Sequence, residues 1–225
     1  MSKNGLYFWT SYRDKRLRFG DERLVKTGIT HSVKGDLRPC FNGLHASKRL
    51  IDALTFIPGS YIWLVSLSDE RIEGKRKACA RSRTYIAGFN AEKMISAFAR
   101  KYVMRDVKRI QPFCNSRHYA LVFDWLLTGG DELRMAARRV SNYVASSTEN
   151  SAQNLPAYVA ARAIIMLTTY PDVVSVKDFL RTLACLKGRA SPSNKDYAQA
   201  NKMLMGMLPN RIKTILAQHE QGEQL

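Results

Sequence analysis

The feature that most constrains the fold is a change of hydrophobic period at Asn90. Before it, short runs rich in β-branched and aromatic residues, such as Tyr61 to Leu67, alternate like strands and are separated by turn residues. After it, apolar residues recur at helical spacing. The sequence therefore predicts an α+β protein, with a small N-terminal antiparallel sheet domain followed by a C-terminal all-α helical bundle. We expect the sheet domain over residues 1–90, a basic linker helix over 91–111 and the helical domain over 112–225.

The N-terminal half predicts strands joined by polar loops, with one helix among them. The expected strands are Gly5 to Thr10, Leu24 to Thr30, Tyr61 to Leu67 and Arg81 to Phe89. Ser47 is placed to cap a helix over Lys48 to Phe56, because a serine hydroxyl can accept a hydrogen bond from the first helical turn. The charged stretch from Asp69 to Lys77 is expected to be a loop around Gly74.

The remainder of the chain carries helix signals and little strand signal. A long helix is expected over Ala91 to Ile110, with Asn90 as its N-cap and Pro112 ending it. Shorter helices are expected over Arg117 to Leu127, Glu132 to Ser146, Ala157 to Tyr170, Val176 to Lys187, Ser193 to Leu208 and Pro209 to His219. The residues that mark their ends are Ser116, Asp131 and Ser175 at N-termini, and Gly129-Gly130 and Gly188 at C-termini. A helix-turn-helix around Ser116 to Tyr143 is an open alternative for the first pair.

The chain is basic along its whole length. Lys and Arg number 36 against 19 Asp and Glu, which gives a net charge of +17 and a pI of about 10.0. The first 90 residues hold 17 basic and 8 acidic side chains, and the rest hold 19 and 11, so no single tail carries the excess. This balance indicates attraction to a polyanion and argues against mimicry of DNA, which needs an acidic surface.

Cysteine usage and hydropathy predict a soluble protein of the cytoplasm. The four cysteines, Cys40, Cys79, Cys114 and Cys185, are scattered without a Cys-x-x-Cys pair, as expected of reduced thiols rather than a zinc knuckle or a disulfide framework. The first residues lack the apolar core of a signal peptide. No run approaches the roughly 20 apolar residues of a membrane-spanning helix.

Two groups of cations are the candidate nucleic-acid-binding residues. The first comprises Arg71, Lys75, Arg76, Lys77, Arg81 and Arg83. The second comprises Lys93, Arg100, Lys101, Arg105 and Lys108, on the polar face of the helix after Asn90. We expect the first group to project from one end of the sheet and to form one continuous positive surface with the second, suited to phosphate contact. The alternative is a set of solvated charges.

The aromatic residues of the first half allow two interpretations. Tyr7, Phe8, Trp9, Tyr61 and Trp63 can stack on bases as a platform for single strands. They also lie at alternating strand positions, which favours a place in the sheet core.

The stretch from Arg38 to Ser47 concentrates residues with chemical potential. A thiol beside an imidazole is an activated nucleophile, so Cys40, His45 and Asn42 are a candidate catalytic trio. The alternative is a fold-defining turn, because Asn42-Gly43 favours tight turns. A metal site at His31, His45 and Cys40 would lack a fourth ligand at suitable spacing.

The motif Pro-Cys-x-Asn-Gly-Leu-His-Ala at residues 39–46 is followed by a short helix, a Pro-Gly turn and a strand. In this it resembles a domain of unknown function that is widespread in tailed bacteriophages and their bacterial hosts. The resemblance covers roughly Gly5 to Phe89. It implies a phage or prophage origin, with the host cytoplasm as the location, and it implies no activity.

The segment from Gly43 to Ser47, its helix and the strand Tyr61 to Leu67 are similar in layout to the nicotinamide-site segment of the ADP-ribosyltransferases. This second resemblance implies NAD as a cofactor, in a cleft beside Gly43-Leu44-His45. The sequence departs from that family in three places. The stacking aromatic falls on Ala53, Leu54 or Thr55, Tyr7-Phe8-Trp9-Thr10 stands where a His-Gly-Thr triplet would open the domain, and no glutamate has a clearly matching position.

These observations give one leading hypothesis and two alternatives. The leading hypothesis is a bacteriophage accessory protein without enzymatic activity or cofactor, which binds DNA or RNA, or a host complex that handles nucleic acid, for example in counter-defence. The first alternative is an NAD-dependent transferase similar to the ADP-ribosyltransferases. The second is a structural protein of the virion.

Overall fold

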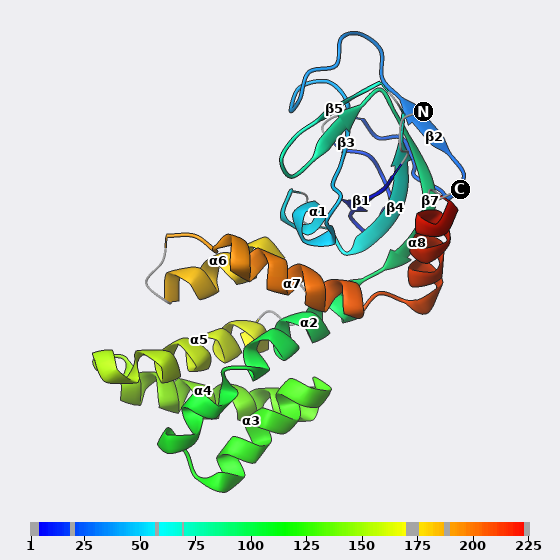
Figure 1. Cartoon of the computed structure of the whole chain (residues 1–225). Coiled ribbons are helices and arrows are strands. Elements are labelled where there is room, and N and C mark those ends of the chain that lie inside the picture. Colours follow the sequence, from blue (N-terminus) through cyan, green and yellow to red (C-terminus); the bar gives the residue numbers. More distant parts are fainter. Residues whose placement is uncertain are drawn as a thin grey trace. The chain divides into compact units, whose positions relative to one another are not determined.

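The chain divides into two compact units. The computed structural model describes residues 5–18, 21–56, 59–68, 70–169, 176–186 and 190–222. Unit 1 comprises Met1–Glu92 together with Asn201–Leu225, and unit 2 comprises Lys93–Ala200. The described strands all belong to unit 1, and unit 2 is helical (Figure 1). The α+β class is therefore confirmed, whereas the return of the C-terminal residues to the first unit was not expected.

A four-stranded antiparallel sheet forms one layer of unit 1. Its strands are β1 (Leu6–Ser11), β2 (Thr30–Ser32), β4 (Tyr61–Leu67) and β7 (Ser82–Asn90), in the order β1-β4-β7-β2. The predicted strands agree with β1, β4 and β7, and β4 has the predicted bounds. The strand expected over Leu24 to Thr30 is wrong in position. Gly28 takes a φ of 84° and turns the chain, so that β2 begins at Thr30.

A second sheet lies where a loop was expected. β3 (Leu44–Ala46), β5 (Arg71–Glu73) and β6 (Ala78–Ala80) pair antiparallel in the order β3-β6-β5. The turn between β5 and β6 is short, and Gly74 N–H donates to the Lys77 carbonyl (2.9 Å). The predicted loop is thus wrong for β5. A strand of three residues shows too little alternation to be recognised from sequence.

Ser47 connects the two sheets. Its N–H donates to the Phe8 carbonyl (2.9 Å), and its carbonyl accepts from the Phe8 N–H (2.7 Å). Ser47 is consequently a bridging residue of the sheets and not the predicted N-cap. The following helix, α1 (Leu50–Phe56), begins three residues later.

The core of unit 1 contains residues from both sheets. Tyr85 of β7 meets Trp9 and Trp63 edge to face, with ring centroids 5.7 and 5.6 Å apart. Leu44, Ala46, Ala78 and Ala80 of the second sheet belong to the same buried cluster. Tyr7, Phe8, Trp9 and Trp63 are each at most 4% exposed, and Tyr61 packs against the cluster. The interpretation of these aromatics as sheet core is confirmed.

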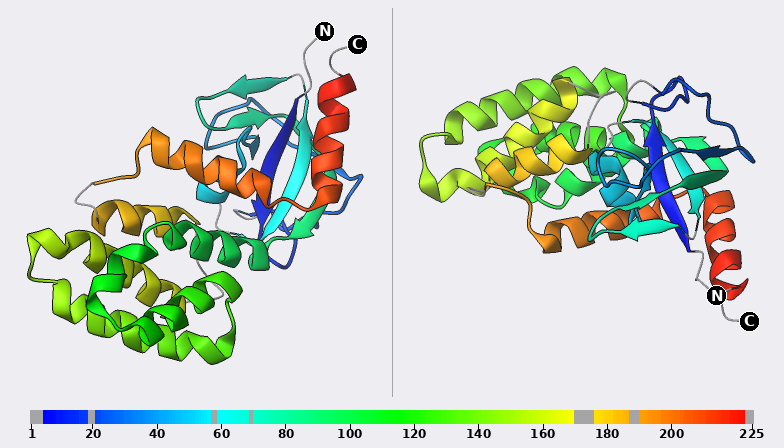
Figure 2. Two further views of the ribbon diagram at one scale, coloured as in Figure 1. Left: turned by 60° about the horizontal axis from the view of Figure 1, so that its bottom comes forward. Right: turned by 90° about the horizontal axis from the view of Figure 1, so that it is seen from above.

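The C-terminal residues complete unit 1. α7 (Asn194–Gly206) enters the unit at Asn201, whose side-chain oxygen accepts from the Ile51 N–H at the start of α1 (3.1 Å). α8 (Asn210–Gly222) follows and lies beside the four-stranded sheet (Figures 1 and 2). Lys213 of α8 donates to the Gly206 carbonyl (2.7 Å), so a cation meets the C-terminal end of α7.

Unit 2 is the predicted helical bundle. Its elements are α2 (Glu92–Met104), the 3-10 helix η1 (Val107–Phe113), α3 (Ser116–Thr128), α4 (Asp131–Thr148), the 3-10 helix η2 (Ala152–Asn154), α5 (Leu155–Thr169), α6 (Val176–Leu186) and the first part of α7. None of the helices in the described ranges is long and apolar enough to cross a membrane.

The helix predicted as a linker belongs to the core of unit 2. Phe98 and Tyr102 of α2 meet Phe179 of α6 edge to face, with ring centroids 6.3 and 5.8 Å apart. The single helix expected from Ala91 to Ile110 is also wrong beyond Met104, where the chain tightens into η1. Pro112 lies inside η1 and has no N–H to donate, which disfavours a continued α-helix.

The bounds of α3, α4 and α5 lie within two residues of the predicted positions. Asn115, rather than Ser116, caps α3, and its side-chain oxygen accepts from the His118 N–H (2.8 Å). Gly129 ends α3 in the left-handed conformation, with φ 73°, as predicted. Gly130, rather than Asp131, is the N-cap of α4. The predicted cap Ser175 and stop Gly188 lie outside the described residues.

Gly88 of β7 should accept no larger side chain. A Cβ there would lie 2.5 Å from Cε3 of Trp63 and 2.8 Å from Cε1 of Tyr61, and Trp63 is too deeply buried to move aside. Gly88→Ala should lower the free energy of unfolding by about 1–3 kcal/mol, the usual cost of overpacking. Urea unfolding measures this, with Gly5→Ala as the control, because a Cβ on Gly5 meets nothing within 4 Å. Equal stability of the two variants would contradict the packing described.

Candidate functional site

A tight turn holds Phe41 in solvent. The Arg38 carbonyl accepts from the N–H groups of Phe41 (3.0 Å) and Asn42 (2.8 Å), and the Arg38 N–H donates to the Asn42 carbonyl (2.8 Å). Cys40, inside the turn, has a φ of 73°, which is uncommon for a residue other than glycine. Phe41 is 91% exposed as a result. Its exposure is therefore imposed by the hydrogen bonds of the turn.

His45, Cys40 and Asn42 come together, and their contacts are structural. The Cys40 N–H donates to Nε2 of His45 (3.1 Å), so this nitrogen is occupied and not available to accept the thiol proton. The Asn42 amide donates to the carbonyls of Lys34 (2.8 Å) and Asp36 (2.9 Å). These bonds support the interpretation as a fold-defining turn. A catalytic role for the trio stays a hypothesis, and the contact that favours it is the hydrogen bond from Lys77 Nζ to the Cys40 sulfur (3.1 Å).

The His45 imidazole is held neutral. Burial lowers the pKa of His45, and the charges of Lys77 and Arg83 lower it further. A neutral ring suits the hydrogen bond from Cys40, because a protonated Nε2 has no lone pair to accept it. Among the residues described, no three side chains of His, Cys, Asp or Glu gather as a metal ion would require.

Gly43 lets the turn run directly into β3. Its φ is 139°, and a Cβ would lie 2.1 Å from the sulfur of Cys79. Only glycine allows this close approach, which places His45 opposite Cys79 in the β3–β6 pair. The predicted turn at Asn42-Gly43 thus has a packing reason as well as a conformational one.

A pocket of about 410 Å³ opens among β1, β3 and α1 of unit 1. It is lined by Phe8 and Trp9 of β1, residues 40–47, and Ala53 and Phe56 of α1. Its ionisable side chains include Arg18, Asp21, His45, Lys77 and Arg83. Asp21 accepts two hydrogen bonds from Arg23 (2.8 and 2.6 Å), which lower the pKa of the carboxyl and offset its charge. The lining of the pocket therefore carries net positive charge.

Arg83 is the buried cation of this pocket and is 2% exposed. Its guanidinium carbon lies 4.0 Å from the ring centroid of Trp9. Nε and Nη2 donate to the Tyr85 hydroxyl (3.1 and 2.8 Å), and Nη1 donates to the His45 carbonyl (2.5 Å). Burial lowers the pKa of Arg83. The carboxylate of Asp21 raises this pKa through space, without forming an ion pair with Arg83. The expectation that Arg83 projects from one end of the sheet is wrong, because the alternation of β7 turns its side chain inward with that of Tyr85.

Three other cations of the 71–83 group are held by carboxylates. The pairs are Arg71–Glu73 (3.0 Å), Arg76–Asp52 (2.7 Å) and Arg81–Glu70. Arg81 also donates to the carbonyls of Val33 (3.2 Å) and Gly35 (2.7 Å), so it clamps that loop. In the described part of the chain, Lys75 and Lys77 have no carboxylate within 4 Å. The 71–83 group thus contains arginines held in ion pairs and two lysines, Lys75 and Lys77, that no carboxylate pairs.

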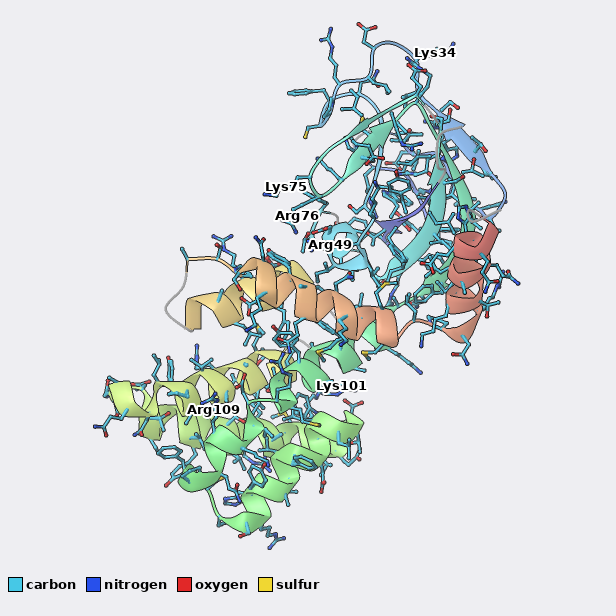
Figure 3. The ribbon with its side chains drawn as sticks, in the orientation of Figure 1. Lys34, Arg49, Lys75, Arg76, Lys101 and Arg109 are labelled. Atoms are coloured by element: carbon cyan, nitrogen blue, oxygen red, sulfur yellow. The ribbon has the colours of Figure 1, made fainter. Side chains whose placement is uncertain are left out.

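A basic surface remains around α1, and we call it the α1 face. It comprises Lys48, Arg49, Lys75, Arg76 and Lys77, together with Phe56. Arg49 and Arg76 both bind the buried carboxylate of Asp52 (2.6 and 2.7 Å), which fixes both guanidinium groups at the surface. Arg76 and Lys77 lie over the ring of Phe56, at 5.3 and 4.9 Å from its centroid. Figure 3 shows Lys75, Arg76 and Arg49 gathered beside α1.

The second group of predicted cations lies on α2 and η1 of unit 2. Lys93, Lys101, Arg105 and Lys108 are exposed, and Figure 3 shows Lys101 on α2. Arg100 is different, because its guanidinium packs against Gly129, where a Cβ would lie 2.4 Å from Cζ. There it meets the C-terminal end of α3, a favourable place for a cation, although burial lowers the pKa of Arg100. The continuous surface expected from both groups stays a prediction, since they belong to different units.

Unit 2 has a larger hollow of about 630 Å³ among η1, α3 and α4. Phe113 and Tyr143 line it, together with His118 and Arg139, whose side chains are exposed. It contains none of the predicted site residues. The pocket of unit 1 is the stronger candidate of the two, because it pairs an apolar lining with a buried charge.

Sequence reasoning missed Phe41, Phe56 and Arg49 as residues of the site. A signal for Phe41 was present, since a large apolar residue between turn formers is forced outward. Arg49 lies three residues before Asp52, the spacing of a helical ion pair. The site has to be interpreted from its geometry, because comparison with family models, with curated proteins and with solved structures finds no match for this chain.

The stability of unit 1 should fall in mild acid because of His45. The folded state keeps the imidazole neutral, whereas the unfolded chain titrates near the ordinary value of 6.5. Acid therefore protonates the unfolded state first, and stability that is full above about pH 6.5 is lost as the pH falls towards the lowered folded pKa. Thermal unfolding from about pH 7.5 to 5 should show a declining Tm.

The decline should be shallower in His45→Gln, whose amide oxygen can accept the Cys40 N–H without titrating. His31, whose pKa burial also lowers, should keep part of the slope in both proteins. Identical pH profiles for the two proteins would show that His45 is not the group responsible.

Proposed function

We propose that this protein binds nucleic acid, DNA or RNA, through the α1 face. The proposal is supported by the surplus of cations there. Asp52 forms ion pairs with both Arg49 and Arg76, and Glu73 forms one with Lys48 (3.6 Å). Among the described residues, Lys75 and Lys77 have no carboxylate within 4 Å. A phosphate backbone supplies the missing negative charge, and its neutralisation releases condensed counterions.

Exposed aromatic rings accompany this charge. Phe56 is 43% exposed beneath Arg76 and Lys77, and Phe41 projects from its turn. Both phenylalanines line the pocket of unit 1. Stacking of a base on such a ring is worth about 1–3 kcal/mol and tolerates any sequence. Because the bases of a duplex are already stacked, these rings favour single-stranded nucleic acid.

The exposed cations of unit 2 extend the proposal. Lys101, Arg105 and Lys108 offer further contacts to phosphate, because their side chains are exposed. The resemblance of residues 5–89 to a phage domain implies that such binding takes place in an infected host. We therefore propose a bacteriophage accessory protein that acts on nucleic acid, or on a host complex that handles it.

A second candidate function is NAD-dependent transfer in the manner of the ADP-ribosyltransferases. The observation that favours it is the pocket itself, which lies against Gly43–His45, where the resemblance implies a cleft. α1 ends in an aromatic residue, Phe56, that lines this pocket. No glutamate lines it within the described ranges, so the acid that transfer requires in that family has no counterpart here. For this reason we rank nucleic-acid binding first.

Binding to a fluorescently labelled single strand should weaken steeply with salt. The slope of log K against log[salt] should be about −0.7 for each phosphate neutralised. The double variant Lys75→Ala/Lys77→Ala should make this slope shallower by about 1.4, because two contacts are lost. Fluorescence anisotropy over a salt series measures both quantities.

Lys34→Ala is the matched control, since Lys34 is an exposed lysine of unit 1 away from the α1 face (Figure 3). It should leave the slope unchanged. An affinity that does not respond to salt, or an equal effect of the control and the double variant, would remove the proposal.

A transfer assay with labelled NAD tests the second candidate function. Incubated with the protein and a bacterial lysate, the NAD should transfer its label to a macromolecule only if the transferase hypothesis holds. Phe56→Ala should then abolish the labelling, whereas Lys34→Ala should not. Nucleic-acid binding without any NAD labelling is the result that we expect.

A further inference from the structure

The pocket of unit 1 contains hydrogen-bond donors that the protein does not use. A guanidinium group has five N–H donors. Arg83 uses one on Nε, one on Nη1 and one on Nη2, in its bonds to the Tyr85 hydroxyl and the His45 carbonyl. One N–H on each terminal nitrogen thus has no partner among the described residues, although the side chain is 2% exposed. Since an unsatisfied buried donor is costly, these two N–H groups indicate a partner from outside the chain.

The charge of the same pocket is unbalanced. Arg83 on its floor and Lys77 on its lining have no carboxylate within 4 Å in the described part of the molecule. Asp21 also lines the pocket, but Arg23 holds it through two hydrogen bonds. The imidazole of His45 is neutral and already accepts from Cys40. The pocket therefore favours a ligand with more than one negative charge.

The rim of the pocket is suited to a planar ring. Phe41 and Phe56 line it and are 91% and 43% exposed, from the turn and from the end of α1. An aromatic ring on one side and a fixed cation on the other is the arrangement that recognises a base and its phosphate. The volume of about 410 Å³ lies within the range of sites for small ligands.

We propose that this pocket binds the phosphate monoester of a nucleotide, with Arg83 as the cation on its floor and Lys77 as the second cation. The base lies against Phe41 and Phe56. A terminal phosphate carries up to two charges and is attached to a single nucleoside, so it can enter a pocket, whereas an internal phosphodiester carries one charge and continues on both sides. The α1 face attracts any phosphate of a strand, and the pocket selects a terminal one. This inference goes beyond the proposed function and does not rest on it.

Titration with AMP and with adenosine tests the proposal. The two ligands differ only in the phosphate. The readout is the change in tryptophan emission, to which Trp9 contributes, because its ring centroid lies 4.0 Å from the guanidinium carbon of Arg83. AMP should bind about tenfold more tightly than adenosine, or better, because charge-assisted hydrogen bonds to phosphate are lost in adenosine. Equal affinity for the two ligands, or no binding of AMP at millimolar concentration, would overturn the proposal.

Three variants assign the residues. Arg83→Lys keeps the charge and loses the planar fork, and it should weaken AMP binding about tenfold. Lys77→Gln should weaken AMP binding severalfold and leave adenosine unchanged. Lys75→Gln is the matched control, because Lys75 lies in the same turn but does not line the pocket. Unchanged affinity for AMP in both Arg83→Lys and Lys77→Gln would overturn the assignment.

Circular dichroism must show that Arg83→Lys is folded, since the side chain that it replaces is buried. If that variant does not fold, Lys77→Gln and Phe41→Ala decide the question, because Lys77 is only half-buried and Phe41 almost fully exposed. Phe41→Ala should weaken AMP and adenosine alike through the loss of stacking. No effect of either variant on AMP binding would sink the proposal.

The 5′ end of a nucleic-acid strand and a free mononucleotide carry the same phosphate monoester. Binding of oligonucleotides shows which of the two is the ligand. Tighter binding of a 5′-phosphorylated single strand than of its 5′-hydroxyl twin, lost in Lys77→Gln, identifies the strand end as the ligand. Tighter binding of AMP than of either strand identifies the free nucleotide. If the α1 face does not bind nucleic acid, AMP should still bind to the pocket. If the pocket does not bind a phosphate monoester, the 5′-hydroxyl strand should still bind with a steep dependence on salt.

Discussion

The structure of unit 1 depends on the contacts of the buried guanidinium group of Arg83. One guanidinium group lies on the ring of Trp9 in β1, donates to the hydroxyl of Tyr85 in β7 and reaches the carbonyl of His45 in β3. Taking a cation out of water costs several kcal/mol, and these hydrogen bonds and ring contacts offset that cost. The packing of β1, β3 and β7 and the burial of Arg83 therefore depend on each other, since strands that moved apart would leave the buried charge without partners.

The turn beside the pocket depends on the same cation. His45 binds Arg83 through its carbonyl and the Cys40 N–H through its ring, so β3 links the core to the turn. Gly43 allows that strand to begin against the sulfur of Cys79. The exposure of Phe41 and the shape of the pocket follow from this packing. In the structure, the motif that contains the candidate catalytic trio forms a turn that lines the pocket.

The positive charge of the chain has two physical roles. Arg81, Arg83 and Arg100 stabilise a loop, a core and a helix end respectively. Lys75 and Lys77 meet no carboxylate among the described residues. The net charge of +17 indicates attraction to polyanions, but it does not distinguish cations that the fold uses from cations that a ligand can use. Burial and ion pairing make that distinction, and in the described part of unit 1 the α1 face and the pocket keep cations that no carboxylate pairs.

Sequence alone determined the features that depend on neighbours in the chain. The α+β class, the bounds of β4 and the end of α3 at Gly129 follow from periodicity and turn chemistry, which act over a few residues. The tertiary structure decided the rest. β3, β5 and β6 are three residues each and exist through their pairing, and Asp52 and Glu70 reach cations 24 and 11 residues away. Which cations are buried, paired or exposed is a long-range property, because desolvation and Coulomb energy depend on what folding brings together.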